Sequence, residues 1–232
     1  MPAFNVSRQP NRGPGWFDCP LARQLVQAEQ RDIIPLLTSH VGVRGLYLRP
    51  SVRLPAALSG NMLQAVICAH RDQQRFTGDL CFADAELPVG TDALNLIYAA
   101  HVLETSTAPE ALLAEFERCL MPEGVLFLIS LSPLSPWRLH WHGATRHSFG
   151  LHRLRMMVQA AGFHAERVQA VGPIWPSRRA SAEATEQASS RSVVVDRLRC
   201  GHLILARKRR PGMTAVGSQR AALRLAAQAR PG

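Results

Sequence analysis

The chain has 232 residues, of which 47% are hydrophobic and 19% are charged, and its formal net charge at pH 7 is +10. This length suits one sizeable domain with tails, and the composition excludes a disordered or fibrous protein. The longest apolar runs, such as Val125 to Leu131, fall far short of the ~20 residues that a membrane-spanning helix needs. We therefore expect a globular domain with no membrane partner.

Much of the positive charge lies near the C-terminus, in RKRR at 207–210 and at Arg220, Arg224 and Arg230. A basic tail of this kind can bind RNA by neutralising phosphates, or it can be a solvated surplus of arginine. Lys208 is the only lysine, which indicates an arginine bias. We favour the solvated tail, so nucleic acid is not an expected partner, and RNA association stays as a third alternative.

The start of the chain and the cysteines bear on its compartment. No hydrophobic segment follows the first basic residues, so the start does not resemble a secretory signal and we expect a cytoplasmic protein. The five cysteines stand singly, without C-x-x-C spacing, which argues against a disulfide framework and a zinc knuckle. The oligomeric state is left open by these features.

The first half of the chain shows a helical pattern and then short apolar runs. Leu21 to Leu37 has the apolar spacing of an amphipathic helix. The runs at Gly45–Leu48, Leu63–Cys68 and Asp79–Ala83 are interpreted as three strands.

The second half contains the clearest unit. Ala93 to Ala100 is a buried strand, Pro109 to Leu120 a helix that begins at a proline, and Val125 to Leu131 a second buried strand. A strand, a helix and a strand in this order predict a right-handed parallel crossover. A helix at 149–161 and strands at 164–171 and 201–207 follow.

The expected domain spans residues 16–210. Residues 1–15 are expected to be flexible, and the basic tail at 211–232 to be disordered, because it offers little to bury. The segment 177–192 is rich in Ser, Ala, Arg and Glu, which suits either a surface helix or an insertion.

The stretch from Asp84 to Trp137 carries several motifs in a fixed order. An L-P pair follows an acidic residue, then a strand ends in H-x-L-E at 101–104, a helix carries L-x-E-x-x-R-x-L at 113–120, and P-x-G follows at 122–124. This order resembles the second half of a type-11 domain of the class I S-adenosylmethionine-dependent methyltransferases. The resemblance covers roughly residues 16–210.

The resemblance implies an α/β fold of the Rossmann-like, doubly wound type. It implies a mostly parallel seven-stranded sheet with helices on both faces, an antiparallel last strand, and ligands at the carboxyl ends of the strands.

The resemblance also implies an S-adenosylmethionine site. The residues at its positions are Leu48, Arg49, Pro50, Ser51, Asp84, Ala85 and Ala100. The glycine-rich loop of the family is degenerate here, because Arg49, Ser51 and Arg53 stand where glycines are usual. Tyr47 stands where an acid is usual. The second strand has Cys68, Ala69 and His70 near the place of a ribose-binding carboxylate, and only Asp72 is available further on.

Two polar residues have open roles at this stage. Asp84 resembles the family's adenine-contacting acid, or it caps a turn or helix. His101 is the candidate catalytic residue, as a pocket wall or base, but a hydrogen-bonded structural role is slightly favoured. Glu104 is expected to be structural, as a cap or as a partner of an arginine such as Arg118.

The loop after the fifth strand of the resemblance carries Trp137, His140, Trp141 and His142, which would face the methyl acceptor. An aromatic plug against the core is the commoner role for such tryptophans. The H-x-H pair lacks a Cys or carboxylate at a metal-binding spacing, so no metal is expected.

The sequence thus predicts a methyltransferase that uses S-adenosylmethionine on an unidentified acceptor. The alternative is a catalytically inactive, methyltransferase-like binding or regulatory protein, which the degenerate loop favours.

Overall fold

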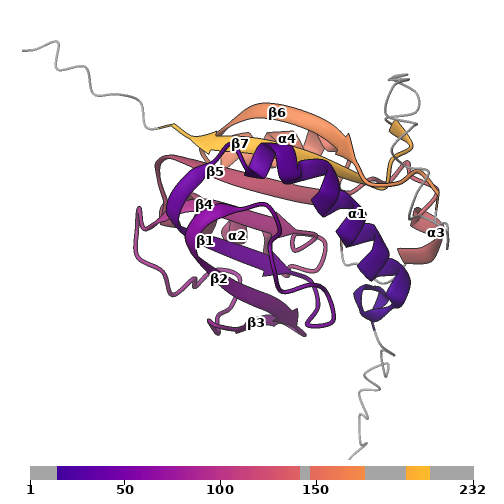
Figure 1. Ribbon diagram of the computed structural model, residues 1–232, viewed down its shortest axis with the longest axis horizontal. Helices are drawn as coiled ribbons and strands as arrows, with labels where there is room; N and C mark the ends of the chain where they lie inside the picture. The colour runs from indigo at the N-terminus through magenta and orange to yellow at the C-terminus, as the bar shows by residue number, and fades with distance from the viewer. Residues whose placement is uncertain (1–14, 142–146, 176–196, 210–232) are drawn as a thin grey trace, which may run out of the picture.

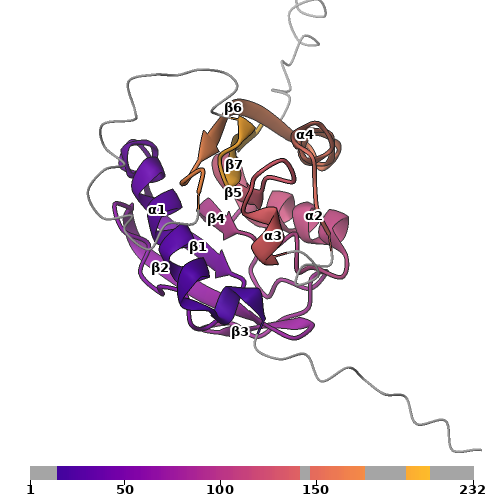
Figure 2. The ribbon, with the colours of Figure 1, turned by 90° about the vertical axis from the view of Figure 1, so that its right-hand side faces the viewer.

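The computed structural model describes residues 15–141, 147–175 and 197–209, which form a seven-stranded sheet with helices on both faces (Figures 1 and 2). The strands are β1 (Val41–Arg49), β2 (Met62–Asp72), β3 (Arg75–Gly78), β4 (Leu94–Ala100), β5 (Leu120–Leu131), β6 (Phe163–Val171) and β7 (Gly201–Lys208). The helices are η1 (Trp16–Asp18), α1 (Pro20–Leu37), α2 (Pro109–Cys119), α3 (Arg138–Trp141) and α4 (Leu151–Ala160). The predicted doubly wound α/β fold is confirmed. The predicted insertion at 177–192, the tail at 211–232 and most of the predicted flexible start lie outside the described residues.

The strand order is β3-β2-β1-β4-β5-β7-β6. The pairs β1–β2, β1–β4 and β4–β5 are parallel, and β7 runs antiparallel to both of its neighbours, as predicted for the last strand. β3 is antiparallel as well, because it returns from β2 as a hairpin that pairs Asp72 with Arg75.

The predicted third strand at Asp79–Ala83 is wrong. The strand lies earlier, at Arg75–Gly78, because Gln73 takes a left-handed φ of 51° and turns the chain back directly after β2. Of the predicted segment, only Phe82 keeps a bridge, to Phe76.

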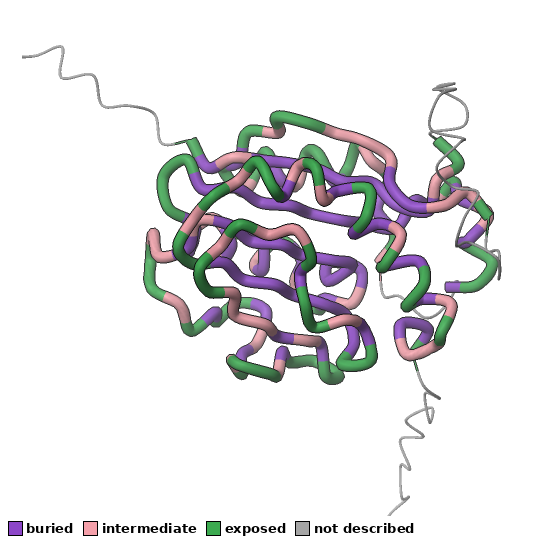
Figure 3. Tube along the Cα trace, viewed as in Figure 1, coloured by how far each residue is buried: buried purple, intermediate pink, exposed green. Residues whose placement is uncertain are grey.

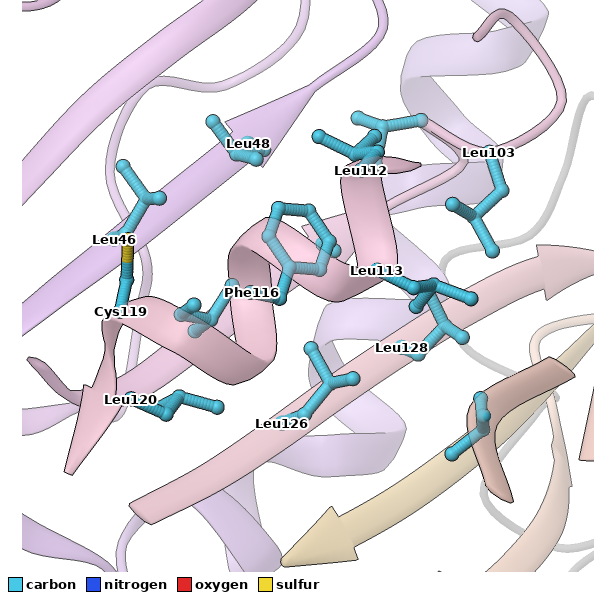
Figure 4. Close-up of a cluster of buried hydrophobic side chains, with 14 of the residues drawn as sticks. Leu46, Leu48, Leu103, Leu112, Leu113, Phe116, Cys119, Leu120, Leu126 and Leu128 are labelled. Atoms are coloured by element: carbon cyan, nitrogen blue, oxygen red, sulfur yellow. The ribbon is translucent and has the colours of Figure 1, made fainter. Parts of the chain in front are cut away.

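The face of the sheet under α2 and α4 holds the larger core. α2 begins at Pro109, as predicted, since proline suits a first helical turn. Its Leu112, Leu113 and Phe116 are fully buried and pack toward Leu46 and other leucines of β1 and β5 (Figure 4). The predicted strand–helix–strand unit is therefore confirmed in β4, α2 and β5.

The opposite face is covered by α1, which crosses it in Figure 1. Pro20 lies at the helix start, and the Cys19 Sγ accepts a hydrogen bond from the Ala22 amide at 3.4 Å. The connection from β1 to β2, residues 50–61, is fully described and contains no helix, and its Leu58 packs against the sheet there. This face is therefore covered by less helix than the other.

Burial follows from this arrangement. Central strands are buried along most of their length, whereas only the carboxyl half of β1 is buried and β2 is largely half-exposed (Figure 3). Among the described helices, none is long and apolar enough to cross a membrane.

Candidate functional site

The carboxyl ends of β1, β2, β4 and β5 point to the right in Figure 1 and face the viewer in Figure 2, where η1, the start of α1, and α3 lie over them. The chain goes outward from β1 to β2 and β3 and then returns to β4 on the other side of β1, so the strand order reverses between β1 and β4. Ligands of open α/β sheets bind at such a reversal. This edge is therefore the candidate site.

The end of β1 is closed by an arginine. The Arg49 side chain is 8% exposed, and its Nη1 donates hydrogen bonds to the backbone oxygens of Val52, at 3.3 Å, and Leu54. The Arg49 Nε is buried and has no hydrogen-bond partner among the described residues. The loop after β1 thus folds around a guanidinium at the place where a glycine-rich loop would leave space.

Ser51 joins this loop to the N-terminal segment. Its Oγ donates a hydrogen bond of 2.5 Å to Asp18 Oδ1 and accepts one from the Arg53 amide at 3.1 Å. Ser51 is 5% exposed. The loop and η1 therefore cover the end of β1 together.

Asp84 is bound on both carboxylate oxygens. Oδ1 lies 2.6 Å from Arg71 Nη1 at the end of β2, and both side chains are buried. Oδ2 accepts hydrogen bonds from Ser106 Oγ at 2.8 Å and from the Thr107 amide and hydroxyl at 2.8 and 2.9 Å. Burial alone would raise the pKa of Asp84, but Arg71 and the hydrogen bonds from Ser106 and the Thr107 amide lower it below its usual value.

Arg71 is held in place by more than this ion pair. Its guanidinium carbon lies 3.9 Å from the centre of the Phe76 ring, and Phe76 stacks on Phe82 at 4.7 Å. The arginine therefore fills the space between the end of β2, the β3 hairpin and Asp84.

His101 follows β4 with a left-handed φ of 50° and is fully buried. Its Nε2 lies 2.7 Å from Glu29 Oε2 on α1, its Nδ1 lies 3.9 Å from Glu104 Oε1, and the Phe17 ring stacks on it at 5.6 Å. Burial by itself lowers the pKa of His101, but the carboxylates of Glu29 and Glu104 reverse this and raise the pKa to about 10. An imidazole that is already protonated cannot act as a base at neutral pH.

Glu104 is not a partner of Arg118, contrary to one expectation from the sequence. Its Oε1 accepts a hydrogen bond of 2.6 Å from the Leu131 amide, so it joins the ends of β4 and β5. Arg118 pairs with Glu115 on its own helix, at 2.7 Å.

The loop after β5 turns its tryptophans inward. Trp137 and Trp141 are each 2% exposed and pack with Phe17, Leu25 and Leu131 in one cluster. The Trp137 Nε1 donates a hydrogen bond of 3.1 Å to the Pro173 oxygen. His140 is exposed and lies beside Trp137, while His142 lies outside the described residues. The described part of this loop is therefore an aromatic plug at the carboxyl edge.

No group of His, Cys, Asp and Glu suited to a metal occurs in the part of the chain that the structure describes. A cavity of about 390 Å³ lies at the opposite, amino end of the strands and is lined by residues such as His40, Asn95, Glu123 and Arg207. It lies away from the strand ends at which this fold binds ligands.

Two residues at the carboxyl edge, Glu29 and Arg71, were not among the sequence candidates. Glu29 stands four residues after Leu25 and four residues before Ile33, on the buried stripe of α1. A carboxylate is rarely buried unless it is paired, so its place on this stripe indicated a buried polar contact. Arg71 meets Asp84 because the chain returns beside β2 through the β2–β3 hairpin. The sequence did not predict this contact, because it placed the third strand at Asp79–Ala83.

Comparisons with known proteins agree with this topology. Residues 56–128, from the loop before β2 to the middle of β5, match the model of a methyltransferase domain. The chain has the class I methyltransferase fold. The resemblance found in the sequence is confirmed, and no curated protein matches the chain.

Three solved structures illustrate the likeness. An S-adenosylmethionine-dependent methyltransferase of Thermotoga maritima shares 15% identity at a TM-score of 0.57, with 84% of this chain and 93% of that chain covered. One from Aquifex aeolicus shares 12% identity at 0.52, with 83% and 95% covered. A [4+2]-cyclase, SpnF, shares 17% identity at 0.50, with 79% and 82% covered. A fold shared with a cyclase does not by itself assign a reaction.

S-adenosylmethionine is the cofactor that this fold implies, and the residues present do not fit it as they lie. Arg49 occupies the loop and would bring a second positive charge toward the cofactor's sulfonium, and Asp84 is engaged by Arg71 on one oxygen and by three donors on the other. Cys68, Ala69 and His70, in the last part of β2, offer no ribose-binding carboxylate, and Asp72, the last residue of β2, is exposed and lies opposite Arg75 of β3. The small residues Ala99 and Ala100 are retained, but both are fully buried.

Proposed function

We propose that this methyltransferase-fold protein does not transfer methyl groups and acts as a binding or regulatory module. The observation that carries the proposal is the buried Arg71–Asp84 pair, at the position that the family resemblance assigns to the cofactor's adenine. A ligand amino group would have to displace a guanidinium 2.6 Å away in a buried setting, where breaking a pair is costly. Arg49 in the loop after β1 supports the same conclusion.

Titration calorimetry tests this directly. We expect S-adenosylmethionine and its demethylated product, each added at up to about 1 mM, to give no binding heat with the wild-type protein, which corresponds to affinity weaker than about 4 kcal/mol. We expect Arg49→Gly combined with Arg71→Ala to regain measurable binding, because the two substitutions reopen the loop and free Asp84.

Arg53→Gly is the matched control, because it removes an arginine from the same loop at an exposed position. Arg53→Gly should give no binding heat, like the wild type. Micromolar binding by the unaltered protein would overturn the proposal and establish a working cofactor site.

The second candidate is an S-adenosylmethionine-dependent methyltransferase acting on an unidentified acceptor. The match of residues 56–128 to a methyltransferase domain favours it. It would place the cofactor against Leu48 to Ser51, Asp84, Ala85 and Ala100, with the acceptor near Trp137 to His142, and it requires Arg71 to leave Asp84. Binding by the wild-type protein, followed by methyl transfer from labelled cofactor, would support this candidate.

A further inference from the structure

The N-terminal segment belongs to two separate packing units. Residues of η1 and the first half of α1, from Trp16 to Val26, pack with Leu54, Trp137, Trp141 and Cys200 in a cluster over the strand ends. Ile33 and Leu37, in the second half of α1, belong instead to the core on the face of the sheet. The two halves of one helix therefore have different partners, with Glu29 between them.

Glu29 is fixed at this boundary by residues that lie next to the ends of three strands. Its Oε2 pairs with His101 after β4, and its Oε1 accepts a hydrogen bond of 3.5 Å from the Cys200 thiol before β7. Gly172 follows β6 with φ +75°, and a Cβ built there would lie 2.2 Å from the Cys200 Sγ and 2.9 Å from the Glu29 Cγ. The absence of a side chain at Gly172 therefore makes room for the Cys200 thiol and for the Glu29 side chain that it contacts.

We propose that residues 16–28 form a hinged cover that is latched over the carboxyl ends of β4 and β5 by the Glu29–His101 contact and that opens as a unit. This cover rests on the proposed function and extends it. A binding module whose ligand-binding edge is covered needs a way to expose that edge.

The contacts of the cover support opening without global unfolding. Among the described residues, its polar attachments to the rest of the protein are few. Asp18 accepts a hydrogen bond from Ser51, and Glu29, directly after the cover, contacts His101 and the Cys200 thiol, while Phe17 adds a ring contact on His101. Its apolar side chains pack in a cluster that is separate from the clusters on the two faces of the sheet and that meets the sheet at Leu131 of β5, so the sheet core stays intact when they leave. Units that contact the core through a separate small cluster open at lower free energy than the whole domain.

Opening would expose a surface of distinct chemistry. His101 and Glu104 would lie at its centre, next to Trp137 and Trp141, which now pack under the cover. A charged pair bordered by two indoles suits a ligand or peptide with an aromatic or cationic group.

Hydrogen exchange of the full-length protein measures this opening. In Glu29→Gln we expect the amides of residues 16–28 to exchange at least about tenfold faster than in the wild type, because the buried imidazolium loses its charged partner. We expect the amides of Ile33 to Leu37 and of β4 to keep their protection, since they belong to the sheet core.

Asp32→Asn is the matched control, because it neutralises a half-exposed carboxylate one turn later on the same helix, while the asparagine oxygen can still accept the hydrogen bond from the Gly172 amide. It should leave exchange in residues 16–28 unchanged. If Glu29→Gln does not fold, Phe17→Ala provides the same test, since it loosens the cover without altering the buried charges. Unchanged exchange in residues 16–28, or an equal rise throughout α1 and β4, would overturn the hinged cover, whatever the calorimetry shows for the cofactor.

Discussion

Arg71→Ala is expected to lower the free energy of unfolding by about 3–5 kcal/mol, because it leaves the Asp84 carboxylate buried without its cation. The side chains of Arg71 and Asp84 are 4% and 2% exposed, so water cannot replace the missing partner in the native structure. The contact of the guanidinium with the Phe76 ring is lost as well. Urea unfolding followed by circular dichroism measures the difference.

Two variants separate this effect from a general loss of an arginine. Arg75→Ala, at an exposed position on β3, is expected to change stability by less than about 0.5 kcal/mol. The double variant Arg71→Ala with Asp84→Ala should be more stable than Arg71→Ala alone, since it also removes the unpaired charge. A loss below about 1 kcal/mol for Arg71→Ala would contradict the buried ion pair.

The stability of the fold is expected to fall as the pH rises from 7 to 8.5. The pKa of His101 is about 10 in the folded protein and 6.5 in its ordinary state, so the folded protein keeps a proton that the unfolded chain has released. The stabilisation is fully present below pH 6.5 and is lost as the pH rises through about 10. The free energy of unfolding should decrease by up to about 1.4 kcal/mol per pH unit in this window.

The range from pH 7 to 8.5 is used because the other groups with shifted pKa values contribute outside it. Burial lowers the pKa of His70 and His202, and their contribution, of opposite sign, is complete by about pH 7. Burial raises the pKa of the Cys119 and Cys200 thiols, which add a further loss of stability above about pH 8.5.

The groups that face His101 are Glu29 on α1 and Glu104 after β4, with Cys200 beyond Glu29. The double variant Glu29→Gln with His101→Gln removes the shifted proton site and is expected to show a much flatter profile. Chemical unfolding at several pH values measures both profiles. A wild-type stability that does not change between pH 7 and 8.5 would show that His101 is not held as a cation.

Local patterns in the sequence were sufficient to predict most of the fold. The continuous apolar runs of β4 and β5, and the helix between them that begins at Pro109, follow from side-chain spacing and proline geometry within a few residues. The hairpin to β3 was missed because it depends on the left-handed backbone of Gln73, a residue type with no strong turn preference.

Patterns within the sequence are sufficient to predict a doubly wound sheet, and to place Arg49 at the end of its first strand, where the resemblance implies a glycine. Which side chains meet at the carboxyl edge, in contrast, follows from the tertiary structure. The Glu29–His101 contact joins residues 72 positions apart, and Arg71 meets Asp84 only because the β2–β3 hairpin returns beside it. Such pairs depend on which strand ends lie together, and the spacing of apolar residues within one segment carries no information about that.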